Sequence, residues 1–411
     1  MSSSLAFSQN ENDALRYSMI NWGGTARFTA MGGAFGALGA DFSTLSTNPA
    51  GLGLFRASEF TLTPSLTYSS INSAYYGTQT EDMKYQLGVQ NVGVVLSFPT
   101  GNNDASGWKA INLGLGLNRH NNYNQRWMAE GFNTDSSLMS DFEIQANQEG
   151  SLGNLDDFST GLAWDTWLIF EDDFGFAVDM WDGQVMQRQE TNSSGSVREF
   201  LMSLAANYND RVYLGATVGI PMVYYEEESI FMESDVDNLN DVFNSLTYTN
   251  RFTTTGLGFN VKAGALIRVT DMIRVGAAFH TPTFYSLEDE FRSTMRSDLN
   301  LEDYDSYAES PDGYFEYELT TPMKAMGSLG LVFGTAGILS VDYEYVDYTA
   351  MRLRSSTYSF SEENRVIEES FTAQHVLRLG GEITLNPVLL RAGYGFYSSP
   401  YASGVNDGSQ S

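Results

Sequence analysis

Side chains that commonly carry out chemistry are few in this 411-residue chain. The chain has no cysteine and three histidines, which excludes disulfide frameworks, cysteine–zinc sites, thiol catalysis and iron–sulfur clusters. His375 has Ser370 nearby, but no third partner that would complete a catalytic triad is evident. We therefore expect that the protein is not an enzyme, with no catalytic residue and no cofactor.

The charge balance is strongly acidic, with 51 acidic and 22 basic side chains and a formal net charge of −29. We expect no nucleic-acid partner, because phosphates need a basic surface. Acidic clusters such as Glu226–Glu228 and Asp235–Asp241 are interpreted as solvated loops, and an ion bridge to surface lipid is the alternative. Asp235–Asp241 lacks the glycine and the distal glutamate of an EF-hand loop, so we expect no metal site.

The dominant pattern in the chain is a strict alternation of apolar residues with small or polar ones. Such alternation, in segments of about ten residues, predicts strands with one apolar face. It predicts eleven strands, which cover residues 60–68, 92–98, 111–117, 200–208, 212–220, 259–269, 273–279, 329–333, 339–345, 377–385 and 388–396.

The connections between these strands alternate strictly between short and long. The short ones are hairpin turns: 209–210, 270–271, 334–336 and 386–387. The long ones are polar: 69–89, 121–195, 226–247, 286–312 and 357–368. A transmembrane β-barrel has this asymmetry, whereas a soluble sandwich has less reason to keep its long loops at one end. No apolar run approaches the roughly 18 residues of a spanning helix. The predicted fold is therefore all-β, a transmembrane antiparallel β-barrel.

Residues 1–55 do not alternate, and we expect them to form an N-terminal hatch inside a barrel of residues 56–411. The glycine-rich stretch 23–41 fails as a dinucleotide fingerprint, because no strand precedes it and no βαβ unit follows. Bacterial barrels have an even number of strands, so eleven strands predict that C-terminal strands are missing from this sequence. Residues 1–10 lack the basic and apolar regions of a signal peptide, and we expect that an export signal is absent too.

The segment before the first strand resembles the N-terminal hatch of the FadL/TodX family of outer-membrane transporters for hydrophobic compounds. The resemblance is carried by Ala-Met-Gly-Gly-Ala at 30–34, by Asp41, and by Asn-Pro-Ala-Gly-Leu at 48–52. It implies a fourteen-stranded barrel in the bacterial outer membrane, plugged by its N-terminal segment. Eleven strands and three missing ones would give that number.

The resemblance also implies a function, the passive uptake of hydrophobic small molecules such as long-chain fatty acids or aromatic hydrocarbons by a monomer in contact with outer-membrane lipid. A groove in the outer loops would catch the molecule, which would enter the lumen and leave sideways once the hatch shifts. The resemblance assigns this gating to Gly32, Gly33, Asn48, Pro49, Ala50 and Gly51. Proline fixes the backbone and asparagine bonds nearby backbone groups, so a purely structural turn is compatible with these residues as well.

Two groups of residues are candidates for contact with a ligand. An aromatic stretch in the second long connection either lines a capture groove or packs that connection against itself: Trp164, Trp167, Leu168 and Phe170. Lys262 and Arg378 fall on inward positions far from the turns, where either could bind a fatty-acid carboxylate. Their alternative role is to pair with inward acids, which include Asp342, Glu344 and Glu382.

A second function is compatible with the same barrel, that of an accessory or surface-attachment subunit of a secretion apparatus. A continuous apolar path from the outer loops into the lumen would favour transport. A lumen filled by the hatch and by charged pairs, with a flat apolar patch at the outer rim, would favour the attachment role.

Overall fold

A 16-stranded antiparallel sheet dominates the structure, a computed structural model that describes residues 10–21, 23–100, 107–179, 184–300 and 305–405. Residues 1–9 and 406–411 lie outside the described residues. The expectations of an absent export signal and of missing C-terminal strands concern these two ends of the sequence. The main path through the sheet runs β1-β2-β3-β7-β8-β9-β10-β14-β15-β17-β18. These are the eleven strands that the alternation predicts, in the predicted order.

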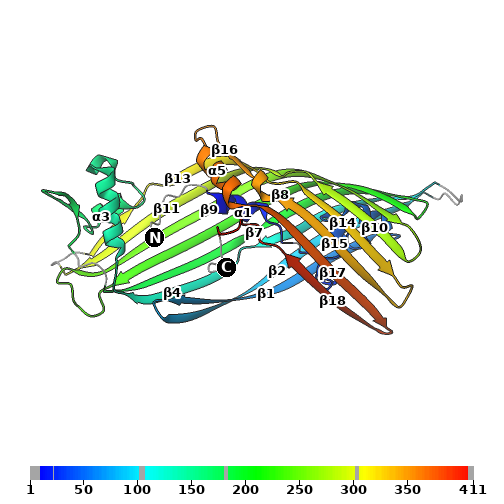
Figure 1. Cartoon of the computed structure of the whole chain (residues 1–411), viewed down its shortest axis with the longest axis horizontal. Coiled ribbons are helices and arrows are strands. Elements are labelled where there is room, and N and C mark those ends of the chain that lie inside the picture. The colour runs from blue at the N-terminus through cyan, green and yellow to red at the C-terminus, as the bar shows by residue number, and fades with distance from the viewer. Residues whose placement is uncertain (1–9, 22, 101–106, 180–183, 301–304, 406–411) are drawn as a thin grey trace.

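The strands of this path lie side by side along the longest axis of the molecule (Figure 1). They are β1 (Glu59–Tyr75), β2 (Thr78–Pro99), β3 (Trp108–Asn122), β7 (Val185–Tyr208), β8 (Val212–Ser234), β9 (Phe243–Arg268), β10 (Ile273–His280), β14 (Lys324–Val332), β15 (Gly337–Asp347), β17 (Ala373–Leu385) and β18 (Val388–Tyr397). The remaining strands of the sheet are β4 (Gln125–Asn133), β11 (Phe284–Leu299), β12 (Asp305–Glu309), β13 (Gly313–Thr320) and β16 (Arg352–Arg354).

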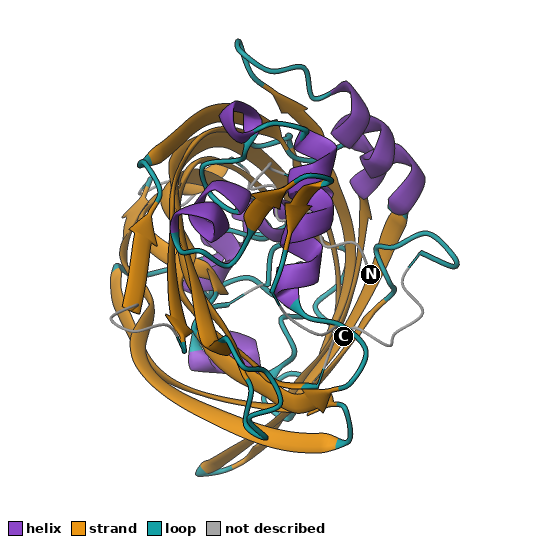
Figure 2. Ribbon diagram, turned by 90° about the vertical axis from the view of Figure 1, so that its left-hand side faces the viewer, coloured by secondary structure: helices purple, strands orange, loops and turns teal. Residues whose placement is uncertain are grey.

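The sheet curls around a group of helices and forms the wall of a barrel (Figure 2). Near the short turns the outward side chains are apolar and exposed, as for Phe60 at 70% and Leu66 at 67%. A band of exposed apolar side chains about 25 Å tall is what a barrel presents to lipid. No described helix is long and apolar enough to cross a bilayer. Within the described residues, no pairing joins β1 to β18, the two strands that end the path.

Three of the five long connections predicted as polar loops, 69–89, 226–247 and 286–312, are mostly strand, and that part of the prediction was wrong. β1 pairs with β2 as far as Tyr75 and Thr78, so residues 69–89 form a hairpin rather than a loop. β8 and β9 likewise stay paired up to Ser234 and Ser245. On β1 the outward positions become polar beyond Tyr68 and on β8 beyond Tyr224, while backbone pairing continues, because an antiparallel sheet tolerates water on one face. The alternation therefore vanishes before the strand does.

Within the connection 121–195, residues 134–179 fold into a small unit at the outer end of the barrel, which we call the outer cap. It contains α3 (Leu138–Glu149), η3 (Leu152–Asn154), α4 (Thr160–Asp165), β5 (Phe170–Asp172) and β6 (Gly175–Ala177). Its apolar side chains pack on inward residues of the wall, for example Phe142 on Tyr248. Glu233 of β8 holds the start of α3 by accepting hydrogen bonds from Ser137 Oγ (2.6 Å) and from the Leu138 backbone N–H (2.8 Å).

The N-terminal segment lies inside the wall. It contains α1 (Glu11–Ser18), α2 (Ala26–Ala30) and the 3₁₀ helices η1 (Phe42–Leu45) and η2 (Pro49–Leu54). Asn10 starts α1 with a capping box in which Asp13 is the partner. The lumen also receives η4 (Tyr348–Ala350) and α5 (Ser361–Ser370), from the connection between β15 and β17. Residues 23–55 fill the end of the lumen near the short turns. From here on, the term hatch refers to this part of the N-terminal hatch expected at residues 1–55.

Candidate functional site

The glycine turn of the hatch lies against strands β17 and β18. Gly32 and Gly33 have φ angles of +63° and +76°, a conformation that side chains with a Cβ rarely adopt. A Cβ on Gly32 would lie 3.0 Å from the backbone nitrogen of Tyr394 and 3.2 Å from the Leu379 carbonyl. Glycine therefore lets the hatch approach the backbone of the wall at this point.

The Asn-Pro-Ala-Gly turn caps η2 and ties the hatch together. Asn48 Oδ1 accepts a hydrogen bond from the Ala50 N–H (3.2 Å), while its Nδ2 donates to the Gly36 carbonyl (2.6 Å) and to the Ala265 carbonyl of β9 (3.3 Å). Pro49 occupies the first helical position, where a missing N–H has no cost. The turn is thus bound both to the rest of the hatch and to the wall.

Glycines of the wall form the seat of this turn. A Cβ built on Gly264 of β9 would lie 2.0 Å from Asn48 Oδ1, and one on Gly215 of β8 would lie 2.4 Å from the carbonyl carbon of Pro49. On the hatch side, the Gly51 carbonyl accepts a hydrogen bond from the Ala40 N–H (3.0 Å). The absence of side chains on both strands therefore lets the hatch touch the wall backbone directly.

Lys262, a candidate for binding a carboxylate, already has one. It is 2% exposed and pairs with Glu199 of β7, whose Oε2 also lies 2.8 Å from Nε2 of His120. Asn260 Nδ2 donates to the other oxygen of Glu199 at 2.9 Å. β3 contributes His120, β7 contributes Glu199, and β9 contributes Asn260 and Lys262, so the register of these three strands assembles the group.

Arg378 is satisfied in the same way on the other side of the lumen. It is 1% exposed, and its Nη2 donates to Glu344 Oε2 at 2.8 Å. We call these two groups together the charged layer: His120, Glu199, Lys262, Glu344 and Arg378. Asp342 beside it accepts a hydrogen bond from the Gly36 N–H of the hatch (2.9 Å). The charged layer therefore lies directly on the hatch, and a ligand carboxylate would have to replace one of its own acids.

Above the charged layer the lumen holds a large apolar cluster, together with the Asp13–Arg16 ion pair of α1. Tyr17 and Leu15 of α1 pack with Tyr285, Tyr317 and Ile367 of the wall and α5 in one buried cluster. The described residues therefore occupy the lumen at three successive levels, which are hatch, charged layer and apolar cluster.

The four candidate residues of the aromatic stretch fall in two environments. Leu168 is buried in the outer cap, and Trp164 packs edge to face on Phe176 with ring centroids 5.9 Å apart. Trp167 and Phe170 are 57% and 38% exposed. All four lie in the outer cap, whereas Lys262 and Arg378 lie in the charged layer, so the structure does not bring the two groups together.

Two cavities involve residues that the sequence reasoning missed. The first, which we call the outer cavity, has a volume of about 620 Å³ and lies between α3 and the inner face of the wall. Its aromatic lining comes from Tyr75, Tyr76, Phe231 and Tyr248. Three of these residues belong to the segments taken for polar loops, where no inward face is expected. The aromatic pair at the tip of the β1–β2 hairpin was the available signal.

The second cavity lies where strands β2 and β3 separate. These strands pair only between Asn91–Pro99 and Ala110–Asn118. Farther out, β2 stays with β1, whereas β3 and then β4 pair with β7. Register irregularities at Thr63/Pro64 in the β1–β2 pair and at Arg119/Asn121 in the β3–β7 pair lie at this level, and bulges of this kind bend strands apart.

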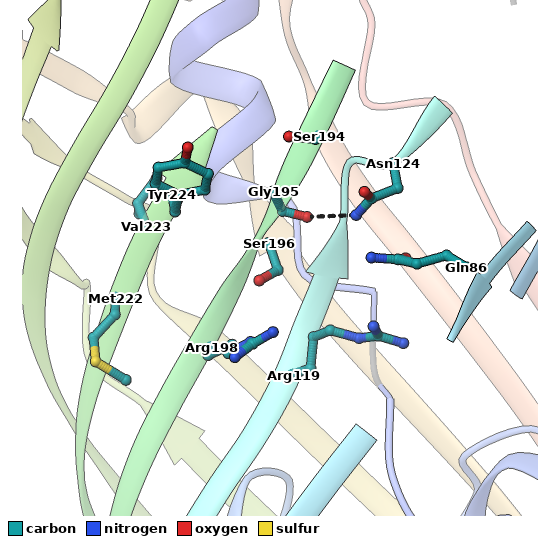
Figure 3. A pocket seen from close by; sticks show the side chains of 10 residues that line it. All are labelled: Gln86, Arg119, Asn124, Ser194, Gly195, Ser196, Arg198, Met222, Val223 and Tyr224. Atoms are coloured by element: carbon teal, nitrogen blue, oxygen red, sulfur yellow. Dashed lines mark hydrogen bonds between the residues drawn. The ribbon is translucent and has the colours of Figure 1, made fainter. Parts of the chain in front are cut away.

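The space at this separation, which we call the wall cavity, has a volume of about 380 Å³. Figure 3 shows its ten lining residues: Gln86, Arg119, Asn124, Ser194, Gly195, Ser196, Arg198, Met222, Val223 and Tyr224. They come from strands β2, β3, β7 and β8 and from the turn between β3 and β4. The wall cavity thus lies on the outward face of β7 and β8, beside the separation of β2 and β3.

The comparisons with known proteins give a fold but no close relative. No family model and no curated protein sequence matches the chain. The crystal structure of the toluene transporter TodX of Pseudomonas putida is similar over 93% of this chain and 85% of its own, with 13% identity and a TM-score of 0.50. Two mutants of the TodX monoaromatic hydrocarbon channel, deltaS2S3 and deltaS2, are also similar. The deltaS2S3 mutant is 14% identical with a TM-score of 0.51, over 94% of this chain and 84% of its own. The deltaS2 mutant is 13% identical with a TM-score of 0.53, over 91% of this chain and 82% of its own. The chain therefore has the fold of the FadL/TodX-type barrels that its hatch sequence resembles.

Proposed function

We propose that the protein is an outer-membrane channel for hydrophobic small molecules, either aromatic hydrocarbons or long-chain fatty acids. We propose further that such a molecule leaves the lumen sideways, at the separation of β2 and β3. The observation that carries this proposal is the separation of β2 and β3 beside the wall cavity, where the backbone pairing of these two strands ends. The fold supports it, because the similar structures are described as a toluene transporter and a monoaromatic hydrocarbon channel.

The charged layer argues against passage straight through the barrel. An apolar molecule that moved along the axis would have to separate Lys262 from Glu199 or Arg378 from Glu344. Removing one partner of a buried ion pair costs about 3–5 kcal/mol, because it leaves the other charge unpaired. An apolar ligand offers no compensating hydrogen bond. A sideways route above this layer leaves both pairs intact.

The outer cavity is the entry that we propose for this route. Its aromatic side chains give an apolar ligand a surface, while hydroxyl and amide groups around them keep the opening wetted. The hatch would then mainly close the end of the lumen near the short turns. In that case the proposed gating by Asn48, Pro49 and Ala50 consists of small shifts at the seat on β8 and β9.

A second function, surface attachment, is favoured by one feature of the outer cap. The β5–β6 hairpin exposes Phe174 at 97%, next to Trp167 and Phe170. Three exposed aromatic side chains at the outer rim are a surface that a partner protein could cover. A lumen filled by the hatch and the charged layer also favours attachment. An experiment must therefore separate attachment from transport.

The absence of cysteine allows a direct test of the sideways route. We would introduce Gln86→Cys and Ser194→Cys, on opposite sides of the wall cavity, and join them with a cleavable bis-maleimide. Leu329→Cys with Val341→Cys, on strands that already pair, is the matched control. Cells that carry each protein in the outer membrane would be assayed for uptake of labelled toluene and labelled oleate.

We expect the cross-link at the wall cavity to lower uptake at least about tenfold and its cleavage to restore uptake, while the control pair has no effect. Uptake that persists through the cross-link would refute the sideways route. A folded protein that takes up neither compound would refute the channel, and a partner search with Phe174→Ser as the negative control would then address attachment.

A further inference from the structure

The wall cavity contains a pair of arginines that transport of a neutral hydrocarbon does not need. We propose that Arg119 and Arg198 form a binding site for the anionic headgroup of an acyl amphiphile that lies at the outer surface of the membrane. The proposal goes beyond the channel function, because it requires only that the barrel sits in a bilayer.

Along β3 and β7 the two arginines end the run of apolar outward residues, whereas on β2 that run continues beyond Gln90 to Met83. Along β7 the outward positions from the short turn upward are apolar: Tyr208, Ala206, Leu204, Met202 and Phe200. Arg198 is the next outward residue. Ten residues of a strand tilted by about 40° rise roughly 25 Å, the height of the lipid-facing band of a barrel. Arg198 therefore lies where the acyl chains end and headgroups begin.

Strand β3 reaches the same boundary with the same type of residue. Its outward positions 111, 113, 115 and 117 are isoleucine and leucine, and the next outward residue is Arg119. Arg119 and Arg198 are directly opposite each other in the β3–β7 pairing. Two adjacent strands therefore place two guanidinium groups side by side at one level of the membrane surface.

The cavity contains no carboxylate to neutralise these charges. None of its ten lining residues is acidic, although the whole chain carries a net charge of −29. Glu199, the neighbour of Arg198 in sequence, points into the lumen and pairs with Lys262. Within the described part of the chain, Arg198 has neither an ion pair nor a hydrogen bond. An anion from outside the protein is the missing partner.

Arg119 is held in place to receive such an anion. It is buried, and its Nη2 donates to Ser65 Oγ (3.0 Å) and to Gln90 Oε1 (2.9 Å), so both partners are neutral. Figure 3 shows Arg119, Arg198 and Gln86 around the same space, with Ser196 beside them. Guanidinium groups bind phosphate and carboxylate through paired N–H donors, and hydroxyl and amide groups complete such a site.

The rest of the lining fits the apolar part of an amphiphile. Met222 and Tyr224 are outward residues of β8, and below them the outward face of β8 continues with Ile220 and Val218. A headgroup in the cavity would therefore have its acyl chain directed down the lipid-facing side of this strand. The chemistry suits two sources equally, the phosphate of a membrane lipid and the carboxylate of a fatty acid.

Native mass spectrometry of the intact chain in a non-ionic detergent tests the site. The probes are dioleoyl phosphatidic acid, oleate, methyl oleate and inorganic phosphate. The diagnostic variant is Arg198→Gln, because its side chain has no partner in the described protein and its loss leaves the fold in place. The matched control is Arg251→Gln, an exposed outward arginine of β9 that pairs with Glu228 at 2.8 Å.

We expect at least one of the two anionic amphiphiles to bind stoichiometrically, and Arg198→Gln to weaken that binding about tenfold, as expected for a lost charge-assisted contact. The tighter of the two identifies the source, phosphatidic acid for a lipid and oleate for a cargo. Equal binding of methyl oleate, equal binding of inorganic phosphate, or an equal effect of Arg251→Gln would overturn the proposal. Because toluene uptake is measured separately, failure of this site and failure of the channel are distinguishable.

Discussion

The seat of the hatch offers a sharp test, the substitution Gly264→Ala. The new Cβ would lie 2.0 Å from Asn48 Oδ1, and real Cβ contacts stay beyond 3.0 Å, so the amide must move by about 1 Å. Overpacking of this kind costs about 1–3 kcal/mol. Each of the two hydrogen bonds that Asn48 Nδ2 donates contributes about 1 kcal/mol, and both weaken when the amide moves. We therefore expect the hatch to lose roughly 2–5 kcal/mol of stability.

The matched control is Gly327→Ala on β14, where a Cβ would meet nothing within 4 Å. Alanine in place of glycine inside a strand is expected to be neutral or to stabilise by about 0.5–1 kcal/mol. The assay is trypsin cleavage after Arg27, a hatch residue that pairs with Glu382 of the wall at 3.1 Å. We expect Gly264→Ala to be cut faster at Arg27 while its barrel still unfolds cooperatively. Equal cleavage of the two variants would refute the contact between hatch and wall.

Three further substitutions probe the other levels of the barrel. Lys262→Ala should destabilise the protein by about 3–5 kcal/mol by removing the lysine that pairs with buried Glu199. Adding Glu199→Gln should recover much of that loss in thermal unfolding, and no recovery would contradict the pairing. Glu233→Ala removes the acceptor at the start of α3, so limited proteolysis should cut the outer cap sooner, and an unchanged pattern would argue against this anchor. In chemical denaturation, Leu168→Ala should lower the free energy of unfolding by about 2–5 kcal/mol, because Leu168 is buried, whereas Trp167→Ala should lower it by under about 1 kcal/mol. The reverse order would show that Trp167 rather than Leu168 is the buried residue.

The path of the wall could be predicted from the sequence because lipid on one side and lumen on the other impose a period of two. Residues such as Leu113 and Leu204 report that environment directly. The same reasoning ended the strands too early, since residues 69–89 and 226–234 are paired strand. The alternation of Met83, Tyr85, Leu87 and Val89 was an available signal for the first of these segments. The hatch turn at 48–51 was found through its resemblance to the family's hatch motif, and close packing on Gly215 and Gly264 explains why few residue types can occupy it.

The charged layer could be predicted only in part. Arg378 pairs with Glu344, one of the inward acids considered for it, because both alternate in phase on neighbouring strands. Glu199 was missed as the partner of Lys262, because it lies just before the predicted start of its strand. The juxtaposition of Arg119 and Arg198 depends on the register between β3 and β7, which the alternation of single strands does not specify.

The contacts that must break differ greatly between the two routes out of the lumen. Movement of the hatch would release Asn48 from β9, Gly36 from Asp342 and Arg27 from Glu382. At the separation of β2 and β3 the backbone hydrogen bonds are already absent. Side chains hold β2 to its neighbours there: Lys84 donates to Asn192 Oδ1 at 2.7 Å, and buried Arg119 of β3 donates to Gln90 Oε1 at 2.9 Å. The exposed contact contributes about 1 kcal/mol or less, so the bonds of Arg119 are the main ones that opening the wall would have to break.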